Sequence, residues 1–270
     1  MRIKNKYALL LLCKLGYLRN GQQLKGLRII KDGRFYIYDV GGMHIASEAF
    51  NWYLTKEILQ AEVHRVSCHH YQPRPGDVVV DVGAGLGEET SIYASMVGPA
   101  GAVYAIEANP PVCEVLQQVI ELNKFDNAQA FNLAINDTRG KVRIDDAPTS
   151  YLSSSINNLV KGTEYEVDGM PFEAFCAREG ITEIDLLKVN IEGAERFFDT
   201  AFSCPELTIR HVAISCHDFR LAGEDNAFFK TKQLVSDYLQ ANGYEIQWQH
   251  TGTHHIDDWV YGEKRAVPGS

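Results

Sequence analysis

The stretch VVVDVGAGLGEET, residues 78–90, joins an apolar run to three glycines at alternating positions and then to two carboxylates. A short apolar run bounded by glycine is typical of a buried strand, and we expect the residues that follow to form a helix up to Gly98-Pro99. The sequence therefore predicts a strand, a glycine turn and a helix. Turns of this kind bind a ligand in many nucleotide-using proteins, so the charge around the glycines decides which ligand fits.

The glycines do not match either of the common phosphate-binding patterns. They stand at Gly83, Gly85 and Gly87, whereas a dinucleotide turn needs its last glycine at the position of Glu88. A phosphate loop needs Lys followed by Ser or Thr, which this stretch lacks. Glu88 and Glu89 begin the helix and would repel a phosphate there. The turn therefore favours an uncharged or cationic ligand.

Two further carboxylates are expected near this turn. Asp81 lies two residues before Gly83, and Glu107 lies twenty residues after Gly87, at the end of the next apolar run, AVYAIEA. An acidic residue at this second position commonly accepts hydrogen bonds from ribose hydroxyls. A ligand with a ribose and a positive charge indicates S-adenosylmethionine. The alternative is that Asp81 and Glu107 only cap turns.

Strands and helices are expected to alternate from residue 77 onward. Further strands are predicted at 128–136, 184–192, 208–217, 244–250 and 258–264, with helices at 110–123 and 230–242 and the last two strands forming a hairpin. This alternation predicts an α/β fold with a mostly parallel, doubly wound sheet. Ligands bind such sheets at the carboxyl ends of the strands.

The first 72 residues are predicted to form an N-terminal extension: a helix, a β-hairpin around Asp32-Gly33, and a helix from 48 to 66. Pro73 and Pro75 mark the boundary to the main domain, residues 73–270. The extension is expected to cover the site or to form a homodimer. Its first helix has a basic start and an apolar run too short to cross a bilayer. We expect this helix to pack on the domain or on a partner; the alternative is that it attaches to a membrane surface.

The composition excludes some classes of partner and location. A net charge of −9 disfavours the broad basic surface that nucleic-acid binding requires. The six cysteines are scattered without a CxxC pair, which indicates reduced thiols and a cytoplasmic protein. The histidines of Cys68-His69-His70 and His254-His255 lack metal-ligand spacing, so no metal site is expected.

Three segments together resemble one family. DVGAGLGEET (81–90), AIEANP (105–110) and DLLKVNIEGAE (185–195) are similar to the FkbM-like family of S-adenosylmethionine-dependent methyltransferases. The resemblance implies a Rossmann-like seven-stranded sheet with one antiparallel strand, S-adenosylmethionine as cofactor, and methylation of a hydroxyl on a small sugar-like or natural-product acceptor. The family signature has Asp where this chain has Asn190, so a charge near cofactor and acceptor is missing.

These motifs predict a cofactor site and a catalytic site. The residues expected to bind the cofactor are Asp81, Gly83, Ala84, Gly85, Gly87, Glu88, Glu107, Ala108, Asn109, Ala134, Asn190 and Glu192. The catalytic candidates are His217, Asn190, Lys188 and Asp218.

Each catalytic candidate has a structural alternative. His217, at the end of a strand, is expected to act as base with Asp218 orienting it, or else to bind backbone. Asn190 would orient a ligand by hydrogen bonds. Lys188 either steadies a developing alkoxide or pairs with Glu192 or Glu195.

The sequence thus predicts an O-methyltransferase for a small hydroxylated acceptor. The segment of Glu195, Arg196 and Asp199 is expected to be solvent-exposed helix surface. Two alternatives stay open: a methyltransferase for protein or RNA, and a catalytically inactive subunit that binds the cofactor and a partner.

Overall fold

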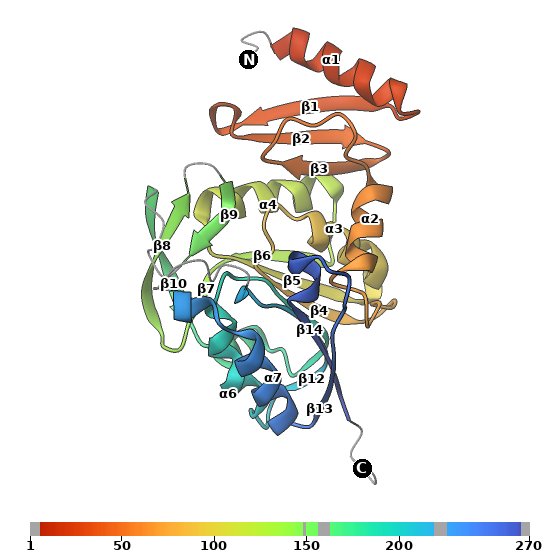
Figure 1. Ribbon diagram of the computed structural model, residues 1–270. Helices are drawn as coiled ribbons and strands as arrows, with labels where there is room; N and C mark the ends of the chain where they lie inside the picture. The colour runs from red at the N-terminus through yellow and green to blue at the C-terminus, as the bar shows by residue number, and fades with distance from the viewer. Residues whose placement is uncertain (1–5, 148–149, 156–162, 219–225, 266–270) are drawn as a thin grey trace.

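A seven-stranded sheet forms the centre of the computed structural model (Figure 1), which describes residues 6–147, 150–155, 163–218 and 226–265. The strand order is β13-β14-β12-β11-β4-β5-β6, and β14 runs antiparallel to both neighbours while the other contacts are parallel. The prediction of a mostly parallel sheet with one antiparallel strand is therefore confirmed. The strands are β4 (Val78–Val82), β5 (Ala102–Glu107), β6 (Ala128–Asn132), β11 (Glu183–Val189), β12 (Thr208–Ser215), β13 (Tyr244–Gln247) and β14 (Trp259–Lys264).

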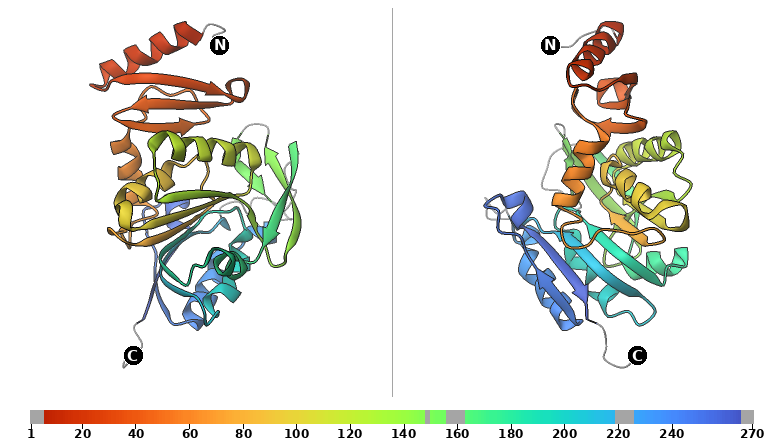
Figure 2. Two further views of the ribbon diagram at one scale, coloured as in Figure 1. Left: turned by 180° about the vertical axis from the view of Figure 1, so that it is seen from behind. Right: turned by 90° about the vertical axis from the view of Figure 1, so that its right-hand side faces the viewer.

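Helices cover both faces of this sheet (Figure 2). Successive residues of β4 point to opposite faces, so Val79 packs in one core and Val80 in the other. The helix α4 begins after Asn109, whose side chain accepts from Val112 N–H, and ends at Lys124 in the left-handed conformation. The helices are α3 (Glu88–Val97), α4 (Pro110–Asn123), α5 (Phe172–Glu179), α6 (Asp199–Phe202), α7 (Lys232–Ala241) and α8 (His254–Asp257).

The N-terminal extension is a separate three-stranded sheet with two helices, at the top of Figure 1. A 3-10 turn at Lys31–Gly33 joins the first two strands, as expected, and Gly41 and Gly42, both at positive φ, lead into a third strand. The last helix begins only after Thr55, whose hydroxyl accepts from Ile58 N–H, so it is shorter than expected. The elements are α1 (Lys6–Arg19), β1 (Leu24–Ile30), β2 (Phe35–Val40), β3 (Met43–Ser47) and α2 (Lys56–Arg65).

A third sheet, which the sequence did not predict, lies beside the carboxyl ends of the central strands (Figure 1). The expected strand 128–136 is interrupted after Asn132, whose side-chain amide donates to the carbonyls of Glu107 and Ala108. The chain then enters the order β7-β10-β8-β9, with β7 (Ala134–Ile135), β8 (Gly140–Ala147), β9 (Ser150–Ser155) and β10 (Thr163–Met170). Within the described ranges, no helix is long and apolar enough to cross a membrane.

Candidate active site

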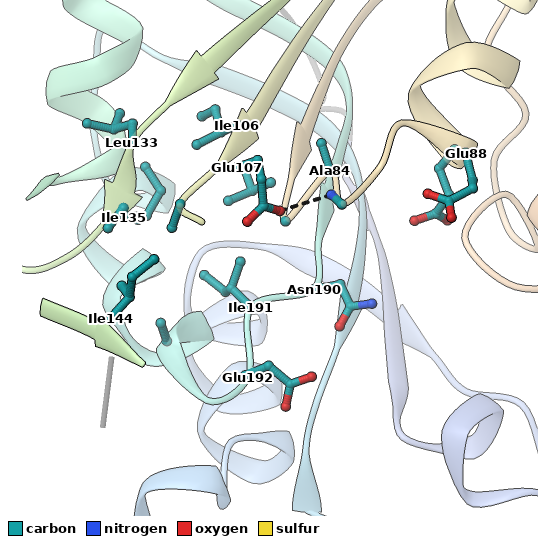
Figure 3. Close-up of a pocket in the computed structure, with 17 residues that line it drawn as sticks. Ala84, Glu88, Ile106, Glu107, Leu133, Ile135, Ile144, Asn190, Ile191 and Glu192 are labelled. Carbon is teal, nitrogen blue, oxygen red and sulfur yellow. Dashed lines mark hydrogen bonds between the residues drawn. The ribbon is translucent and has the colours of Figure 1, made fainter. Parts of the chain in front are cut away.

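A cavity of about 920 Å³, counted with its open mouth, lies at the carboxyl ends of β4, β5 and β11 (Figure 3). Nine predicted site residues line it: Gly83, Ala84, Gly85, Glu88, Glu107, Ala108, Ala134, Asn190 and Glu192. The remaining lining residues were not predicted: Val82, Glu89, Ile106, Leu133, Ile135, Ile144, Ile191 and Ala194.

The glycine turn is held against two neighbouring strands. The N–H groups of Gly83 and Ala84 both donate to Ile106 O, at 2.9 and 3.0 Å. On the other side, Asn190 N–H donates to Val82 O at 2.9 Å. Gly87 has φ +91°, and a Cβ there would lie 2.8 Å from Leu116 Cδ1. Gly87 therefore lets α3 approach α4 and does not itself line the cavity.

Glu107 is fixed by the backbone on two sides. Its Oε2 accepts from Gly85 N–H at 3.0 Å and its Oε1 accepts from Asn109 N–H at 2.8 Å (Figure 3 shows the first bond). Burial raises the pKa of Glu107 to about 7. Each carboxylate oxygen can accept a further hydrogen bond, so hydroxyl donors fit here. Asn109 contributes its backbone to this arrangement while its side chain caps α4.

The cavity has an apolar wall and an acidic wall. Ile106, Leu133, Ile135 and Ile144 form the apolar side, and Ile144 reaches it from β8 (Figure 3). The carboxylates of Glu88, Glu89 and Glu192 belong to the acidic side, and burial raises the pKa of Glu88 to about 7. A base, ribose hydroxyls and a positive charge would each find a suitable partner among these groups. The residues present therefore fit S-adenosylmethionine.

Lys188 lies behind the cavity wall and is almost completely buried. Its Nζ donates to Asp81 Oδ1 at 2.8 Å and to Gly83 O at 2.9 Å, and it lies 2.8 Å from Glu89 Oε2. Burial alone would lower the pKa of Lys188, but Asp81 and Glu89 raise it above its ordinary value. Lys188 thus pairs with Asp81 and Glu89 and not with Glu192 or Glu195. It secures the glycine turn through Gly83 O, and neither Lys188 nor Asp81 lines the cavity.

His217 lies between two glutamates and also does not line the cavity. Its Nδ1 is 2.5 Å from Glu195 Oε1, and its Nε2 is 3.4 Å from Glu192 Oε1. Burial would lower the pKa of His217, but Glu195 and Glu192 raise it to about 10. The imidazole is therefore protonated at neutral pH and has no lone pair for accepting a proton. This arrangement differs from the free histidine base expected from the sequence.

Two neighbours of His217 also differ from expectation. Glu195 is fully buried, not solvent-exposed, because it is turned inward on the 3-10 helix Ala194–Phe198. Asp218 does not orient His217 in the described part of the chain. Its Oδ1 accepts from the N–H groups of Thr231 and Lys232, at 3.0 and 2.9 Å, and so stabilises the start of α7.

Glu192 connects this buried pair to the cavity. It follows the end of β11 and adopts φ +57°, a left-handed conformation that costs energy for a residue other than glycine. The residue lines the cavity while its Oε1 faces His217. Strained residues of this kind cluster at functional sites, so Glu192 becomes a stronger candidate for chemistry than His217. Asn190 lines the same side (Figure 3).

The chain matches known proteins in this region. Residues 81–246, more than half of the chain, match the family model described as the methyltransferase FkbM domain. Protein-L-isoaspartate O-methyltransferase of Aeropyrum pernix is 43% identical over 49 residues, which are 18% of this chain and 19% of that protein. The matched segment thus spans about a fifth of that relative's length.

The solved structures that the chain matches include other methyltransferases. Methyltransferase FkbM of Methylobacillus flagellatus has 16% identity and a TM-score of 0.48, covering 75% of this chain and 50% of that one. Aeropyrum pernix fibrillarin, solved with bound S-adenosylmethionine, has 13% identity and a TM-score of 0.44. The match covers 89% of this chain and 99% of that one.

Proposed function

This chain belongs to the FkbM family of S-adenosylmethionine-dependent methyltransferases, and from that membership we propose that it methylates a hydroxyl oxygen of a small, uncharged, sugar-like acceptor. The observation that supports this proposal is the position of Glu192 at the cavity wall with a buried cation, His217, behind it. The cofactor supplies a methyl group on a positively charged sulfur. The protein must supply a place for the acceptor and for the proton that leaves it.

Glu192 is the proposed proton acceptor. The Glu192 carboxylate would accept the proton that the acceptor hydroxyl loses when its oxygen is methylated. His217, held by Glu195, keeps that carboxylate in place and is a positioning residue. Asn190 has amide N–H and C=O groups with which to orient the same hydroxyl. Alignment of the reacting atoms then supplies much of the rate.

The cofactor would lie along the glycine turn. We assign the ribose hydroxyls to Glu107, the base to the apolar wall near Ala108 and Ala134, and the positive end to Glu88. Gly83 and Gly85 let the ligand approach the backbone. Asp81, Gly87 and Asn109 act indirectly, through the contacts that fix the turn and the two helices.

The acidic wall argues against negatively charged acceptors. Glu88, Glu89 and Glu192 would repel the phosphates of RNA and the carboxylate that an isoaspartyl residue presents. A neutral hydroxyl meets no such repulsion. The acceptor proposed here therefore differs from the isoaspartyl residue that names the O-methyltransferase matched over 49 residues.

The chemical stability of the product tests this assignment. The protein is incubated with donor labelled in the methyl group and with sugars, other hydroxylated metabolites, peptides containing isoaspartate, and RNA. A label that mild alkali does not release, and that is carried by a sugar or other hydroxylated metabolite with no nitrogen or sulfur to methylate, is an ether, as expected for a hydroxyl acceptor. Release as methanol would identify a carboxyl ester and overturn the proposal. Absence of turnover despite donor binding would favour the inactive-subunit alternative.

All six cysteines are free thiols, and five of them are buried. Thiols remain reduced in the cytosol, so we also propose a cytoplasmic location. Fractionation of cells that express the full chain checks this, and recovery of the protein in the secreted fraction would contradict it.

A further inference from the structure

The helix α1 is apolar around most of its circumference. One face, with Leu9, Cys13 and Tyr17, is buried against the N-terminal extension. The Tyr17 hydroxyl donates to Leu54 O at 3.0 Å, which fixes this face in place. A surface helix of a soluble protein usually has a polar opposite face, and α1 does not.

The opposite face presents leucines to solvent. Leu11, Leu15 and Leu18 lie on successive turns of one side, and Leu12 lies next to them. Figures 1 and 2 show that α1 is the outermost element of the extension, on the side away from the central sheet. The exposed face is therefore not covered by the described part of the chain.

Two aromatic side chains extend this face. Trp52 packs beside Gly16, where a Cβ would lie only 2.7 Å from Trp52 Cβ, and Asn20 Nδ2 donates to Trp52 O. Tyr53 follows it. We define the α1 patch as Leu11, Leu12, Leu15, Leu18, Trp52 and Tyr53, all of them between 50% and 69% exposed. Contiguous apolar surfaces of this kind mark interaction sites.

The sequence segment that carries the four leucines of the patch has basic side chains and no acidic ones. Residues 1–31 contain eight basic and no acidic side chains, whereas the rest of the chain holds 18 basic and all 35 acidic ones. Lys14 and Arg19 are exposed on the patch helix itself, and Lys25 and Arg28 are exposed on the adjoining β1. An acidic protein thus has a basic segment where its apolar surface is exposed.

We propose that the α1 patch docks on a membrane surface that contains anionic lipid. A helix of 14 residues is about 21 Å long, shorter than the roughly 30 Å hydrocarbon core, so α1 would lie in the plane of the interface. Leucines would enter the acyl region, Trp and Tyr suit the headgroup level, and the basic side chains would contact lipid phosphates. This inference does not depend on which acceptor is methylated.

Other occupants fit less well. A second copy of the chain would bring an equally basic patch against this one, and the like charges would repel. RNA would use the basic side chains but would leave the leucines exposed. Of these three occupants, only lipid satisfies both features of the surface.

Vesicle flotation of the full chain tests the proposal. We expect binding to phosphatidylcholine vesicles that contain phosphatidylglycerol, weaker binding when salt is raised, and little binding to phosphatidylcholine alone. Leu15→Asp should lower binding by about tenfold or more, because it places a charge in the apolar contact. Leu234→Asp, also at a half-exposed leucine of a helix but on α7, is the matched control and should bind like the wild type.

A second readout locates the contact. Tryptophan emission should shift to the blue on binding anionic vesicles, and Trp52→Phe should abolish the shift while the protein still floats. The proposal is overturned if no vesicle is bound, if Leu234→Asp loses as much binding as Leu15→Asp, or if anionic vesicles leave the tryptophan emission unchanged. It is also overturned if sedimentation shows a dimer that Leu15→Asp dissociates, or if RNA is bound in preference to vesicles.

Discussion

Gly83 and Asn190 approach so closely that a Cβ on Gly83 would lie 2.0 Å from the backbone oxygen of Asn190. These residues belong to two of the three sequence segments that resemble the family, and they are more than a hundred positions apart. The glycine turn and the end of β11 therefore hold each other in place. The shape of the cavity depends on this contact as much as on the residues that face a ligand.

Gly83→Ala should destabilise the protein by at least about 2 kcal/mol and weaken donor binding, because strain and a collision with backbone act together. Gly252 offers a matched control, since it has the same φ of +77° and a Cβ added there would meet no atom of the described residues within 4 Å. Gly252→Ala should lower the free energy of unfolding only by the cost of placing alanine at a positive φ. Urea unfolding of both variants measures the difference, and equal losses would contradict the role of the contact.

Lys188→Met should lower the free energy of unfolding by about 3–5 kcal/mol, because Asp81 would remain buried without its cation. Lys141 forms an ion pair of the same 2.8 Å length with Asp168, but on the surface. Lys141→Met should leave the unfolding midpoint unchanged. Thermal or urea unfolding of the Lys188→Met and Lys141→Met proteins measures the difference in stability. A stable Lys188→Met protein with low kcat would instead support the alkoxide role.

Glu192→Gln should lower kcat by about 10²–10³-fold, since the amide cannot accept the hydroxyl proton. Binding of the donor, measured by titration calorimetry, should change much less. Glu245→Gln, at an exposed position of β13, is the control. If kcat of Glu192→Gln matches the wild type, the proton leaves by another route.

The buried pair of His217 and Glu195 should make stability depend on pH. The pKa of His217 is raised from 6.5 to about 10 in the folded protein, so its contribution is complete below pH 6.5 and is lost as the pH rises through 10. Urea unfolding across this interval should show a decline for the wild type. His217→Gln should be less stable at low pH and show a flatter profile. Parallel profiles for both proteins would disprove the assignment.

Donor affinity should rise with pH around neutrality. Burial raises the pKa of both Glu88 and Glu107 to about 7, and a cation and hydroxyl donors favour the ionised carboxylates. Glu107→Gln should weaken donor binding by about 10–100-fold and make the pH profile shallower. Titration calorimetry at several pH values measures this, with Glu121→Gln, at an exposed position of α4, as control. A pH-independent wild-type affinity would argue against these groups as ligands.

Local patterns predicted the elements that bury apolar side chains regularly. Helix α4 has the expected bounds, and the central strands lie where apolar runs predicted them. The strands β8 and β10 were missed although polar and apolar residues alternate along them and bury residues such as Ile144 and Val167. The expected strands were taken mainly from continuous apolar runs, which these two segments lack. The buried Glu195 was missed because a 3-10 helix turns every three residues, so a helical period of 3.6 places that side chain wrongly.

Partners for charged groups were the least predictable part of the site. Glu195 meets His217 across 22 positions, and Lys188 meets Asp81 across 107. Neither pairing leaves a trace in local spacing, because strand order decides which residues become neighbours. The motif residues Gly85, Glu107 and Glu192 did reach one cavity, since parallel strands end at the same edge of a sheet.

The placement of the basic segment at one end of the molecule has a consequence for how the protein turns in solution. Residues 1–31 have a formal charge of +8 and the rest of the chain −17, so the molecule has a large permanent dipole directed toward α1. Close to any negatively charged surface, this dipole exerts a torque that aligns the molecule before contact. The N-terminal end arrives first, and the acidic domain with its cavity faces the bulk solvent.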